Sequence, residues 1–586
     1  MADRPVRWRR RVIILLILLV VAGFATRAWR QRGGSVDSDS WVLLDLQGSY
    51  AEDGADDTLA RLFGEATPSL LDLLLTIRDA GEDPRVAGVV VRVRPLAVGW
   101  AKAQEIRDAL ISYRASGKPL HAYLELELGG GSMEYYVASA AGHIHVPPGA
   151  AAPVTGLLAQ YVFLGGVWEK LDIQMQVLKI REYKTFGDML SEKKMTPWHR
   201  EMADALLDSL YGQLVDGIAM QRHLTPAVVR ALIDQGPAMP AELIRAGLVD
   251  DAQFLEQLRV ALVGADGEWL KGEDYAGARR PLPNAPSVRR KMAVIYGVGA
   301  VVSGESSSNP TGGESTMGAD TLTAAFVEAS KDDDVEAIVF RVDSPGGSAL
   351  AADLIWQAAD AARALKPVVV SMSDVAASGG YYVAAPGTKI LASPGTLTGS
   401  IGVVLAKPNV RGLLAKLGIN TVEMQRGDLA SMLSVNENFT PKQLARVTAT
   451  MDYIYDLFVQ RVAAGRSLDK AQVNEVGRGR VWTGAQAVEH GLVDELGGFL
   501  TAINAAKTAA GIPLEEKVGL VFYPKHKSLV QRLGKALGTR VFGAAPVWWQ
   551  HVQRATAAFY FQPGSVLTLM PEEIVIRSGA GCWGAG

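Results

Sequence analysis

One serine lies at a turn where its hydroxyl could do nucleophilic chemistry. Ser378 stands in Ala377-Ser378-Gly379-Gly380, after the apolar run Pro367 to Val370 and before the helix-compatible residues Tyr381 to Ala385. A serine at a strand-to-helix turn is well placed to attack a carbonyl, and neighbouring glycines let backbone N–H groups approach the attacked atom. A tight turn before a core helix is the alternative for this motif alone, so the rest of the chain has to decide.

The elements that would position this serine form an internal repeat. Tyr135 to Ala138 recurs as Tyr381 to Ala384, and Gly247 to Asp250 recurs as Gly491 to Asp494 at nearly the same spacing. In each copy apolar strands alternate with helices, a rhythm that predicts parallel-rich sheets with right-handed crossovers. We therefore expect an α/β fold made of two tandem repeats with peripheral helices.

The N-terminal segment has the pattern of a membrane anchor. Five arginines precede an apolar run from Val12 to Ala25, and Arg27, Arg30 and Arg32 follow it. Since the more positive flank stays in the cytoplasm, we expect one transmembrane helix in the inner (cytoplasmic) membrane, with the catalytic bulk on the periplasmic side. A cleaved signal peptide is the alternative, because Gly23-Phe24-Ala25 offers small residues at a cleavage site.

The length of 586 residues exceeds what one hydrophobic core normally holds. The repeat, the anchor and the shifts in composition predict five segments. These are 1–32 (basic segment and anchor), 40–273 (N-terminal repeat), 274–291 (a Pro- and Arg-rich linker), 292–512 (C-terminal repeat) and 513–586 (a C-terminal extension).

Composition excludes several classes of function. The formal net charge is −3, which argues against a nucleic-acid partner. The single cysteine, Cys582, excludes an internal disulfide and a cysteine-cluster metal site. The eight histidines show no HExxH spacing, and His143 and His145 share one face of a predicted strand without a completing ligand nearby. We therefore expect no metal and no other cofactor.

The glycines of the serine motif occur in only one copy. Val335 to Val342 runs into Asp343-Ser344-Pro345-Gly346-Gly347-Ser348, whereas the matching strand of the first copy runs into Arg94-Pro95-Leu96-Ala97-Val98. Ser378-Gly379-Gly380 likewise matches Ser132-Met133-Glu134. Glycines needed only by the fold would be present in both copies. Their restriction to one copy indicates a task performed once, such as aiming backbone N–H groups at a developing oxyanion.

A serine nucleophile needs a base, because its hydroxyl is weakly nucleophilic at neutral pH. No histidine of the second copy lies near a motif. Lys184 follows a strand-like run, Gln174 to Lys179, in the first copy, and the corresponding stretch of the second copy, Met424 to Met432, has no lysine. This division predicts one composite site built from both copies. Burial in an apolar groove is expected to lower the pKa of Lys184 from about 10.4 toward the working pH.

Several motifs, in the same order, resemble the signal peptide peptidase A family in its long two-repeat form, also called protease IV. The segments that carry the resemblance are Asp343–Ser348, Ala377–Tyr382, Leu397–Gly402, Gly479–Gly484 and, for the lysine, Tyr183-Lys184 with Met195-Thr196-Pro197. The resemblance covers roughly residues 41–522. It implies a ClpP/crotonase-like fold in each repeat. It also implies a membrane-anchored serine peptidase that digests signal peptides once they have been cut from exported proteins.

The resemblance also implies a role for each matched residue. The implied site residues are Ser378 (nucleophile), Lys184 (general base), Ser400 (orients the lysine), and Gly346, Gly347 and Gly379 (oxyanion N–H donors). Two features depart from the family, namely the C-terminal extension and Asp343, a position where relatives frequently carry asparagine.

The expected partners follow from this assignment. They are hydrophobic peptides such as signal-peptide remnants, the membrane, and other copies of the chain in a tetramer-like ring that encloses an apolar groove. A crotonase-like acyl-CoA hydrolase or hydratase is one alternative, since such folds share the glycine-lined oxyanion hole. A catalytically inactive membrane scaffold is another.

Overall fold

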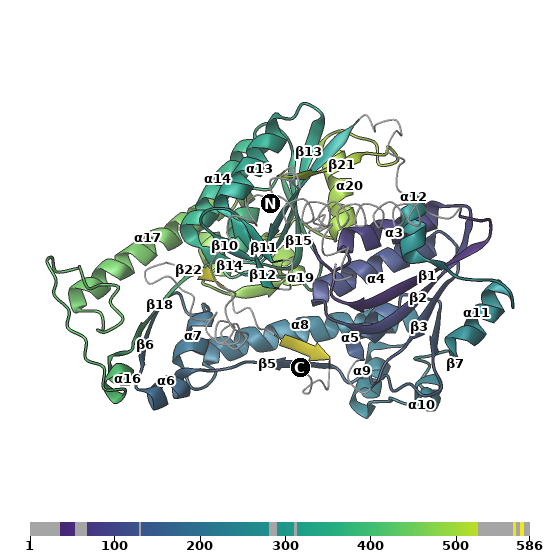
Figure 1. Cartoon of the computed structure of the whole chain (residues 1–586), viewed down its shortest axis with the longest axis horizontal. Helices are drawn as coiled ribbons and strands as arrows, with labels where there is room; N and C mark the ends of the chain where they lie inside the picture. Colours follow the sequence, from purple (N-terminus) through teal and green to yellow (C-terminus); the bar gives the residue numbers. More distant parts are fainter. Residues whose placement is uncertain are drawn as a thin grey trace, which may run out of the picture.

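The computed structural model describes residues 36–52, 67–127, 131–279, 290–309, 313–524, 567–569 and 575–578. Strands and helices alternate along most of this chain and form two α/β bodies that lie side by side (Figure 1). The parallel-rich α/β class expected from the sequence is thereby confirmed.

The first body contains a six-stranded sheet with the order β7-β4-β3-β2-β1-β8. Each neighbouring pair in it is parallel. Its strands are β1 (Ser40–Gly48), β2 (Val86–Leu96), β3 (Leu120–Leu124), β4 (His143–Val146), β7 (Asp251–Ala252) and β8 (Leu270–Lys271).

The second body repeats this order around β9, β13 and β15. β21 lies beside β9 as β8 lies beside β1, β16 and β20 continue beyond β15, and β17 and β19 form a further branch. β19 is antiparallel to β17, and the other pairs are parallel. The strands are β9 (Lys291–Val298), β13 (Val335–Ser344), β15 (Val368–Ala377), β16 (Lys389–Ala392), β17 (Leu397–Gly399), β19 (Val481–Thr483), β20 (Glu495–Leu496) and β21 (Gly519–Tyr523).

The two bodies share a hydrophobic core. Successive side chains of a strand point to opposite faces of its sheet, so one face of the second sheet can pack against the first body. Met292 and Val294 of β9 join the core of the first body, whereas Ala293 and Ile295 face a second core. The helices α13 and α14 cover the second face, and α20 covers the first together with α4 of the first body. These helices are α4 (Trp100–Ala115), α13 (Ala319–Lys331), α14 (Ala349–Arg363) and α20 (Phe499–Ala509).

A third sheet joins the repeats and has the order β11-β12-β10-β14-β22-β18-β6. In it β6 of the first repeat runs antiparallel to β18 of the second, from Ile180 opposite Val403 to Gln174 opposite Asn409. Its strands are β6 (Gln174–Ile180), β10 (Ala300–Val302), β11 (Ser307–Asn309), β12 (Gly313–Gly318), β14 (Gly346–Ser348), β18 (Val403–Asn409) and β22 (Leu567–Leu569).

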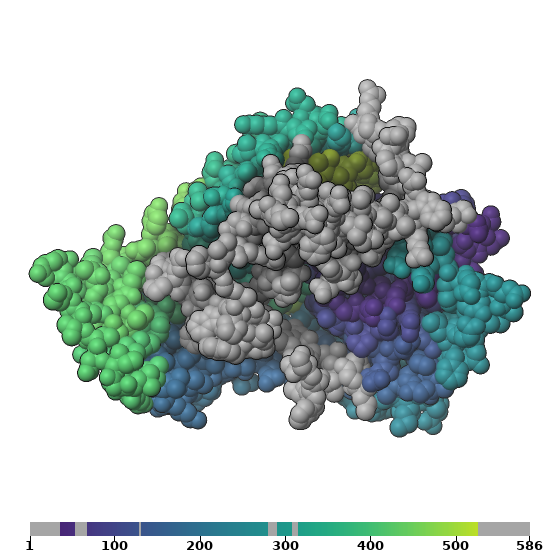
Figure 2. Space-filling model, in the orientation of Figure 1, coloured from purple at the N-terminus to yellow at the C-terminus, as the bar shows by residue number. Residues whose placement is uncertain are grey.

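Two long helices occupy equivalent places in the repeats. α8 (Pro197–Arg222) and α17 (Pro441–Arg466) each begin with proline after a capping threonine, Thr196 or Thr440. Such a start suits a helix, because proline lacks the N–H that would be unpaired there and the threonine hydroxyl accepts from a first-turn N–H. α16 (Arg411–Lys416) and the N-terminal part of α17 form a lobe at one end of the molecule (Figure 2).

Two predicted boundaries need correction. β21 pairs with β9 beyond residue 512, so the sheet of the C-terminal repeat extends to Tyr523. The predicted linker 274–291 overlaps α12 (Gly272–Arg279), where Tyr275 is fully buried and its hydroxyl lies 3.3 Å from Asp83. Part of the segment that has the composition of a linker is therefore packed into the core through Tyr275.

The expected anchor, residues 12–25, lies outside the described part of the chain. Within the described ranges, no helix combines the length and the hydropathy of a membrane span.

Candidate active site

Ser378 lies between the end of β15 and the start of α15 (Gly379–Ala384). Its backbone has φ 55° and ψ −114°, a conformation that non-glycine residues rarely adopt. The Ser378 N–H donates to the Gly399 carbonyl at 2.8 Å, which ties this turn to β17. The strand-turn-helix context expected for a nucleophilic serine is therefore present, with the side chain fully buried.

Lys184 reaches this serine because of the pairing between β6 and β18. The chain leaves β6 at Ile180, next to Val403, and turns so that Lys184 enters the second repeat. Lys184 Nζ lies 2.7 Å from Ser378 Oγ. It also lies 3.0 Å from both Ser400 Oγ and the Ser400 carbonyl oxygen. Three hydrogen-bond partners thus surround one buried amine.

Burial lowers the pKa of Lys184 well below its ordinary value. The amine is almost fully enclosed, with 1% of the residue exposed. Its three near partners are two hydroxyls and a carbonyl, none of which carries the negative charge that would favour the ammonium form. A neutral amine in this position can accept the proton of the Ser378 hydroxyl.

Ser400 combines its contact with the lysine and an unusual backbone. Its φ is 53°, and its N–H donates to the Arg480 carbonyl at 2.7 Å. This backbone geometry places both the carbonyl and the hydroxyl of Ser400 on Lys184 Nζ. The structure therefore brings Ser378, Lys184 and Ser400 together.

Glycines before and after Ser378 allow the Gly346–Gly347 loop to approach the serine turn closely. A Cβ on Gly347 would come 2.1 Å from the Val301 carbonyl oxygen, and a Cβ on Gly380 would come 2.5 Å from the Ser344 carbonyl oxygen. Gly346 has φ 107°, and its N–H donates to Ser344 Oγ at 3.2 Å. Gly379 begins α15, where backbone N–H groups lack intrahelical partners. The glycine loop and the start of α15 thus both adjoin Ser378.

Gly479 supports the lysine, a role that sequence reasoning missed. Its φ is +83°, and a Cβ there would come 2.5 Å from the Lys184 backbone nitrogen. The neighbouring Arg478 carbonyl accepts from the Tyr183 N–H at 3.1 Å. The motif Gly479–Gly484 is visible in the sequence, but its neighbours along the chain do not reveal that it packs against the backbone of Lys184.

The matching turn of the first repeat, around Ser132, contains a bound carboxylate where the second repeat has glycines. Ser132 Oγ accepts from the N–H groups of Thr155 and Gly156 at 3.2 and 3.1 Å. The Glu134 carboxylate accepts from the N–H groups of Leu96 and Gly131, both at 2.9 Å. This carboxylate bridges the end of β2 and the start of α5 (Ser132–Ala138), where the other copy holds its glycines.

Comparison with known proteins agrees with this geometry. The model of peptidase family S49 matches residues 112–264 and 360–513, one stretch in each repeat. The chain belongs to peptidase family S49. It is therefore a serine peptidase, which decides against the acyl-CoA hydrolase and the inactive scaffold. The predicted resemblance to the long two-repeat form is also confirmed.

Two relatives of this S49 chain span most of its length. The chloroplastic serine protease SPPA of Arabidopsis thaliana is 35% identical over 89% of this chain and 76% of its own. Protease 4 of Haemophilus influenzae is 28% identical over 85% of this chain and 83% of its own.

Among solved structures, a ClpP1 variant from Listeria monocytogenes matches 36% of this chain and 94% of its own. The identity is 12% and the TM-score 0.24, so the ClpP/crotonase-like likeness stays a prediction.

Proposed function

We propose that this S49 peptidase is an endopeptidase with a Ser–Lys dyad made of Ser378 and Lys184. The observation that carries the proposal is the position of Lys184 Nζ, 2.7 Å from Ser378 Oγ and buried among neutral partners. A lysine with a lowered pKa is the base that a buried serine nucleophile requires.

The reaction would proceed through an acyl-enzyme. Neutral Lys184 takes the hydroxyl proton as Ser378 Oγ attacks the scissile carbonyl, and the new ammonium then protonates the leaving amine. Backbone N–H groups of the glycine loop (Gly346 and Gly347) and of Gly379 would face the oxyanion, where one donor is typically worth about 3–4 kcal/mol. Lys184 next removes a proton from water as that water attacks the ester, and Ser378 is released. The two hydrogen bonds that Lys184 Nζ donates to Ser400 keep the amine oriented through both steps.

The substrate would be an extended peptide that binds between β14 and β18. The chain itself supports this, because β22 lies there antiparallel to both strands, with Leu569 opposite Gly346 and Leu567 opposite Val404. A backbone held by strand pairing at an oxyanion loop is the recognition mode of an unfolded peptide, and a folded domain would not fit it.

Signal peptides released from exported proteins are the proposed natural substrates, consistent with the family and with relatives named SPPA and Protease 4. We further propose that residues 12–25 anchor the enzyme in the inner membrane, with the peptidase on the periplasmic side and assembled as a homo-oligomer. The apolar run after five arginines supports the anchor.

Two substitutions in the full chain test the dyad. Ser378→Ala and Lys184→Ala should each lower kcat on an unfolded hydrophobic peptide by at least about 10³-fold, by analogy with other nucleophile and base deletions. Lys193→Ala is the matched control, because Lys193 is exposed and pairs with Glu169 on the surface. A fluorophosphonate should label the wild type at Ser378. Substantial activity in either dyad variant would overturn the assignment.

Mixing the two inactive variants tests where the dyad forms. In the structure both side chains belong to one chain. Mixed Ser378→Ala and Lys184→Ala protomers should therefore remain inactive, and recovered activity would indicate a dyad formed between subunits.

A further inference from the structure

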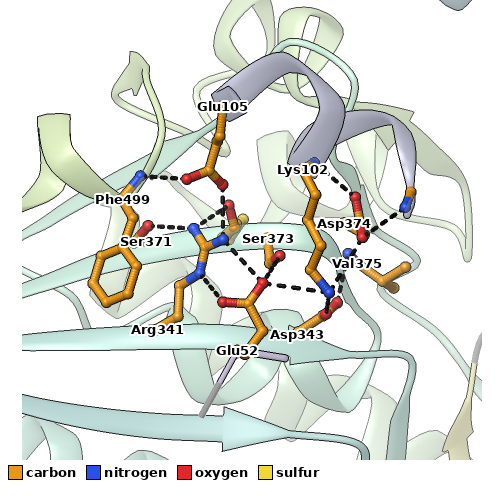
Figure 3. A network of polar contacts seen from close by, with 12 residues as sticks. Glu52, Lys102, Glu105, Arg341, Asp343, Ser371, Ser373, Asp374, Val375 and Phe499 are labelled. Atoms are coloured by element: carbon orange, nitrogen blue, oxygen red, sulfur yellow. Dashed lines mark hydrogen bonds and ion pairs between the residues drawn. The ribbon is translucent and has the colours of Figure 1, made fainter. Parts of the chain in front are cut away.

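A cluster of buried charges lies at the contact between the repeats (Figure 3). It includes Asp374, four residues before Ser378 in the chain. Arg341 is fully buried, and its guanidinium donates to Glu52 at 2.8 and 3.0 Å and to Glu105 at 2.7 Å. Lys102 Nζ lies 2.8 Å from Asp343 Oδ2 and 3.4 Å from Asp374 Oδ2. Burying charges is costly unless each is paired, so such a cluster needs a reason to exist here.

The cluster is built from both repeats. Glu52 follows β1, and Lys102 and Glu105 lie on α4, all in the first repeat. Arg341 and Asp343 lie on β13 and Asp374 on β15, in the second repeat. Each of these ion pairs therefore joins the repeat that supplies the proposed base to the repeat that supplies the proposed nucleophile.

The position of the cluster coincides with a break in the second sheet. β13 and β15 pair regularly up to Val342 opposite Met372, and pairing resumes with Ser344 opposite Ala376. Between these points Asp343 alone faces Ser373, Asp374 and Val375. Such a bulge interrupts the backbone ladder, and bulges are frequent beside active sites. This one separates the strand that leads to the oxyanion loop from the strand that leads to Ser378.

Side chains replace the missing ladder at the bulge. Asp343 Oδ1 accepts from the Val375 N–H at 3.1 Å, three residues before Ser378. Asp374 accepts from the N–H groups of Gly99 and Lys102 at 3.1 and 2.9 Å, at the start of α4. The Lys102 ammonium lies between the two aspartates. One cation of the first repeat thus ties both strands to α4.

The helix α4 packs closely against β15 at the cluster. A Cβ on Gly99 would come 2.2 Å from the Asp374 carboxyl carbon, so α4 approaches β15 as closely as a glycine allows. Farther along the same helix, Gln104 Oε1 accepts from the Gly395 N–H at 2.7 Å, just before β17 and Ser400. α4 therefore contacts all three segments of the second repeat that carry proposed catalytic groups.

We propose that Lys102 is a positioning residue for the peptidase reaction, which acts through Asp343 and Asp374 to hold the oxyanion loop and Ser378 at their working separation. The inference rests on the proposed function of Ser378. It assigns the first repeat a second contribution besides Lys184. The two buried lysines have opposite tasks, one neutral beside hydroxyls and one charged among carboxylates.

The charge states agree with this division. Burial opposes the ammonium form of Lys102, but Asp343, Asp374 and Glu52 together hold its pKa well above the ordinary value. Burial raises the pKa of Asp374, and Lys102 counteracts this rise. Without the cation, Asp343 and Asp374 would face each other at the bulge, with Glu52 and the Arg341–Glu105 pair behind them.

The decisive variants are Lys102→Met and the double variant Lys102→Met/Asp343→Asn, both in the full chain. Loss of the cation removes the attraction that opposes the raised pKa of Asp374, so repulsion between Asp374 and the other carboxylates of the cluster should grow as the pH rises and Asp374 ionises. For Lys102→Met we expect kcat to fall about 10- to 100-fold, as misplacement of reacting groups does, with KM within about twofold. The ratio of its kcat to that of the wild type should decrease with increasing pH.

The double variant should recover most of kcat and lose this pH dependence. Asparagine keeps an oxygen for the Val375 N–H and removes one of the two facing charges. A merely structural role for Lys102 would change thermal stability but not the rate per active site, counted by fluorophosphonate labelling of Ser378. Lys118→Met is the matched control, since Lys118 Nζ donates within its own repeat, to the carbonyls of Ala80 and Asp83.

The outcomes separate this inference from the proposed function. If the wild type is not labelled at Ser378, both fail. If Ser378 is labelled and Lys102→Met retains the wild-type kcat per labelled site, Lys102 is not a positioning residue although the dyad stands. Should Lys102→Met not fold, Asp374→Asn tests the pairing of Lys102 with β15 instead, because it keeps an acceptor for the α4 N–H groups and removes the charge that pairs with Lys102, so kcat should fall. An unchanged kcat in that variant would overturn the inference.

Discussion

Ser132 and Ser378 occupy matching turns of two sheets with the same strand order, yet their hydroxyls have different partners. At the first, backbone N–H groups bind the serine hydroxyl and the Glu134 carboxylate joins the two sides of the pocket. At the second, an amine binds the hydroxyl, and Gly380 stands in the place of Glu134.

This difference shows what the fold requires of the turn. The donors at the end of β2 and the start of α5 need an acceptor, and a built-in carboxylate provides one in the first repeat. In the second repeat Gly380 stands at the matching position, so no carboxylate is present there. The first turn thus has a carboxylate bound to its backbone donors, whereas the second has the Lys184 amine at its serine and no side chain at Gly380.

Moving the carboxylate into the second repeat should have the largest effect. Gly380→Glu should lower kcat/KM by about 10²–10³-fold or more, since a side chain there would meet the Ser344 carbonyl oxygen at 2.5 Å and displace the turn that holds Ser378. Peptide hydrolysis measures the loss, and thermal unfolding checks the fold. The reverse change, Glu134→Gly in a Ser378→Ala background, should create no activity because, within the described residues, the hydrogen-bond partners of Ser132 Oγ are backbone N–H groups and not a lysine. Peptide hydrolysis by that double variant would contradict this distinction between the two turns.

Ser400→Asp should alter the pH dependence through the lysine. In the wild type, kcat/KM should rise as the pH increases through the lowered pKa of Lys184 and be high well below the ordinary lysine pKa. A carboxylate beside Nζ favours the ammonium form, so the rise should move to higher pH. Ser400→Ala, which loses one neutral hydrogen bond, should lower kcat about tenfold. An unshifted profile in Ser400→Asp would contradict the assigned base.

Lys184 should also lower the stability of the folded protein near neutral pH. Its pKa is lowered on folding, so below the unfolded value of about 10.4 the unfolded chain binds the extra proton and is favoured. Wild-type stability should therefore rise with pH in the window between the folded and unfolded pKa values, by about 1.4 kcal/mol per pH unit. Denaturation midpoints of Lys184→Met should lack this slope. An equal slope in both proteins would mean that Lys184 is charged.

The smallest expected effect concerns the C-terminal extension, which pairs with both repeats. β22 lies beside β14, and β23 (Val575–Ser578) lies antiparallel to β5 (Leu157–Gln160), just after the N–H groups that bind Ser132. Because β22 occupies the proposed peptide path, deletion of residues 561–586 should lower KM about two- to fivefold, a small effect typical of a competing weak contact. Deletion of 579–586, which keeps both strands, should leave KM unchanged.

Much of the fold was predictable, because local patterns carry it. Apolar alternation and the recurrence of Gly247 to Asp250 as Gly491 to Asp494 predicted two parallel-rich α/β units. The boundaries were less predictable. Tyr275 lies in a stretch with the composition of a linker but is fully buried, and β21 joins its sheet through partners more than two hundred residues earlier.

The sequence alone singled out Ser378, the glycines beside it and a lysine in the other copy, because complementary differences between repeats are visible without a structure. Only the tertiary structure brought these groups to hydrogen-bond distance, through the pairing of β6 with β18. It alone showed Glu134 in the degenerate pocket and Lys102 at the bulge. The physical reason is that conformation follows from neighbours along the chain, whereas the charge of a buried lysine depends on neighbours in space, which are hydroxyls around Lys184 and carboxylates around Lys102.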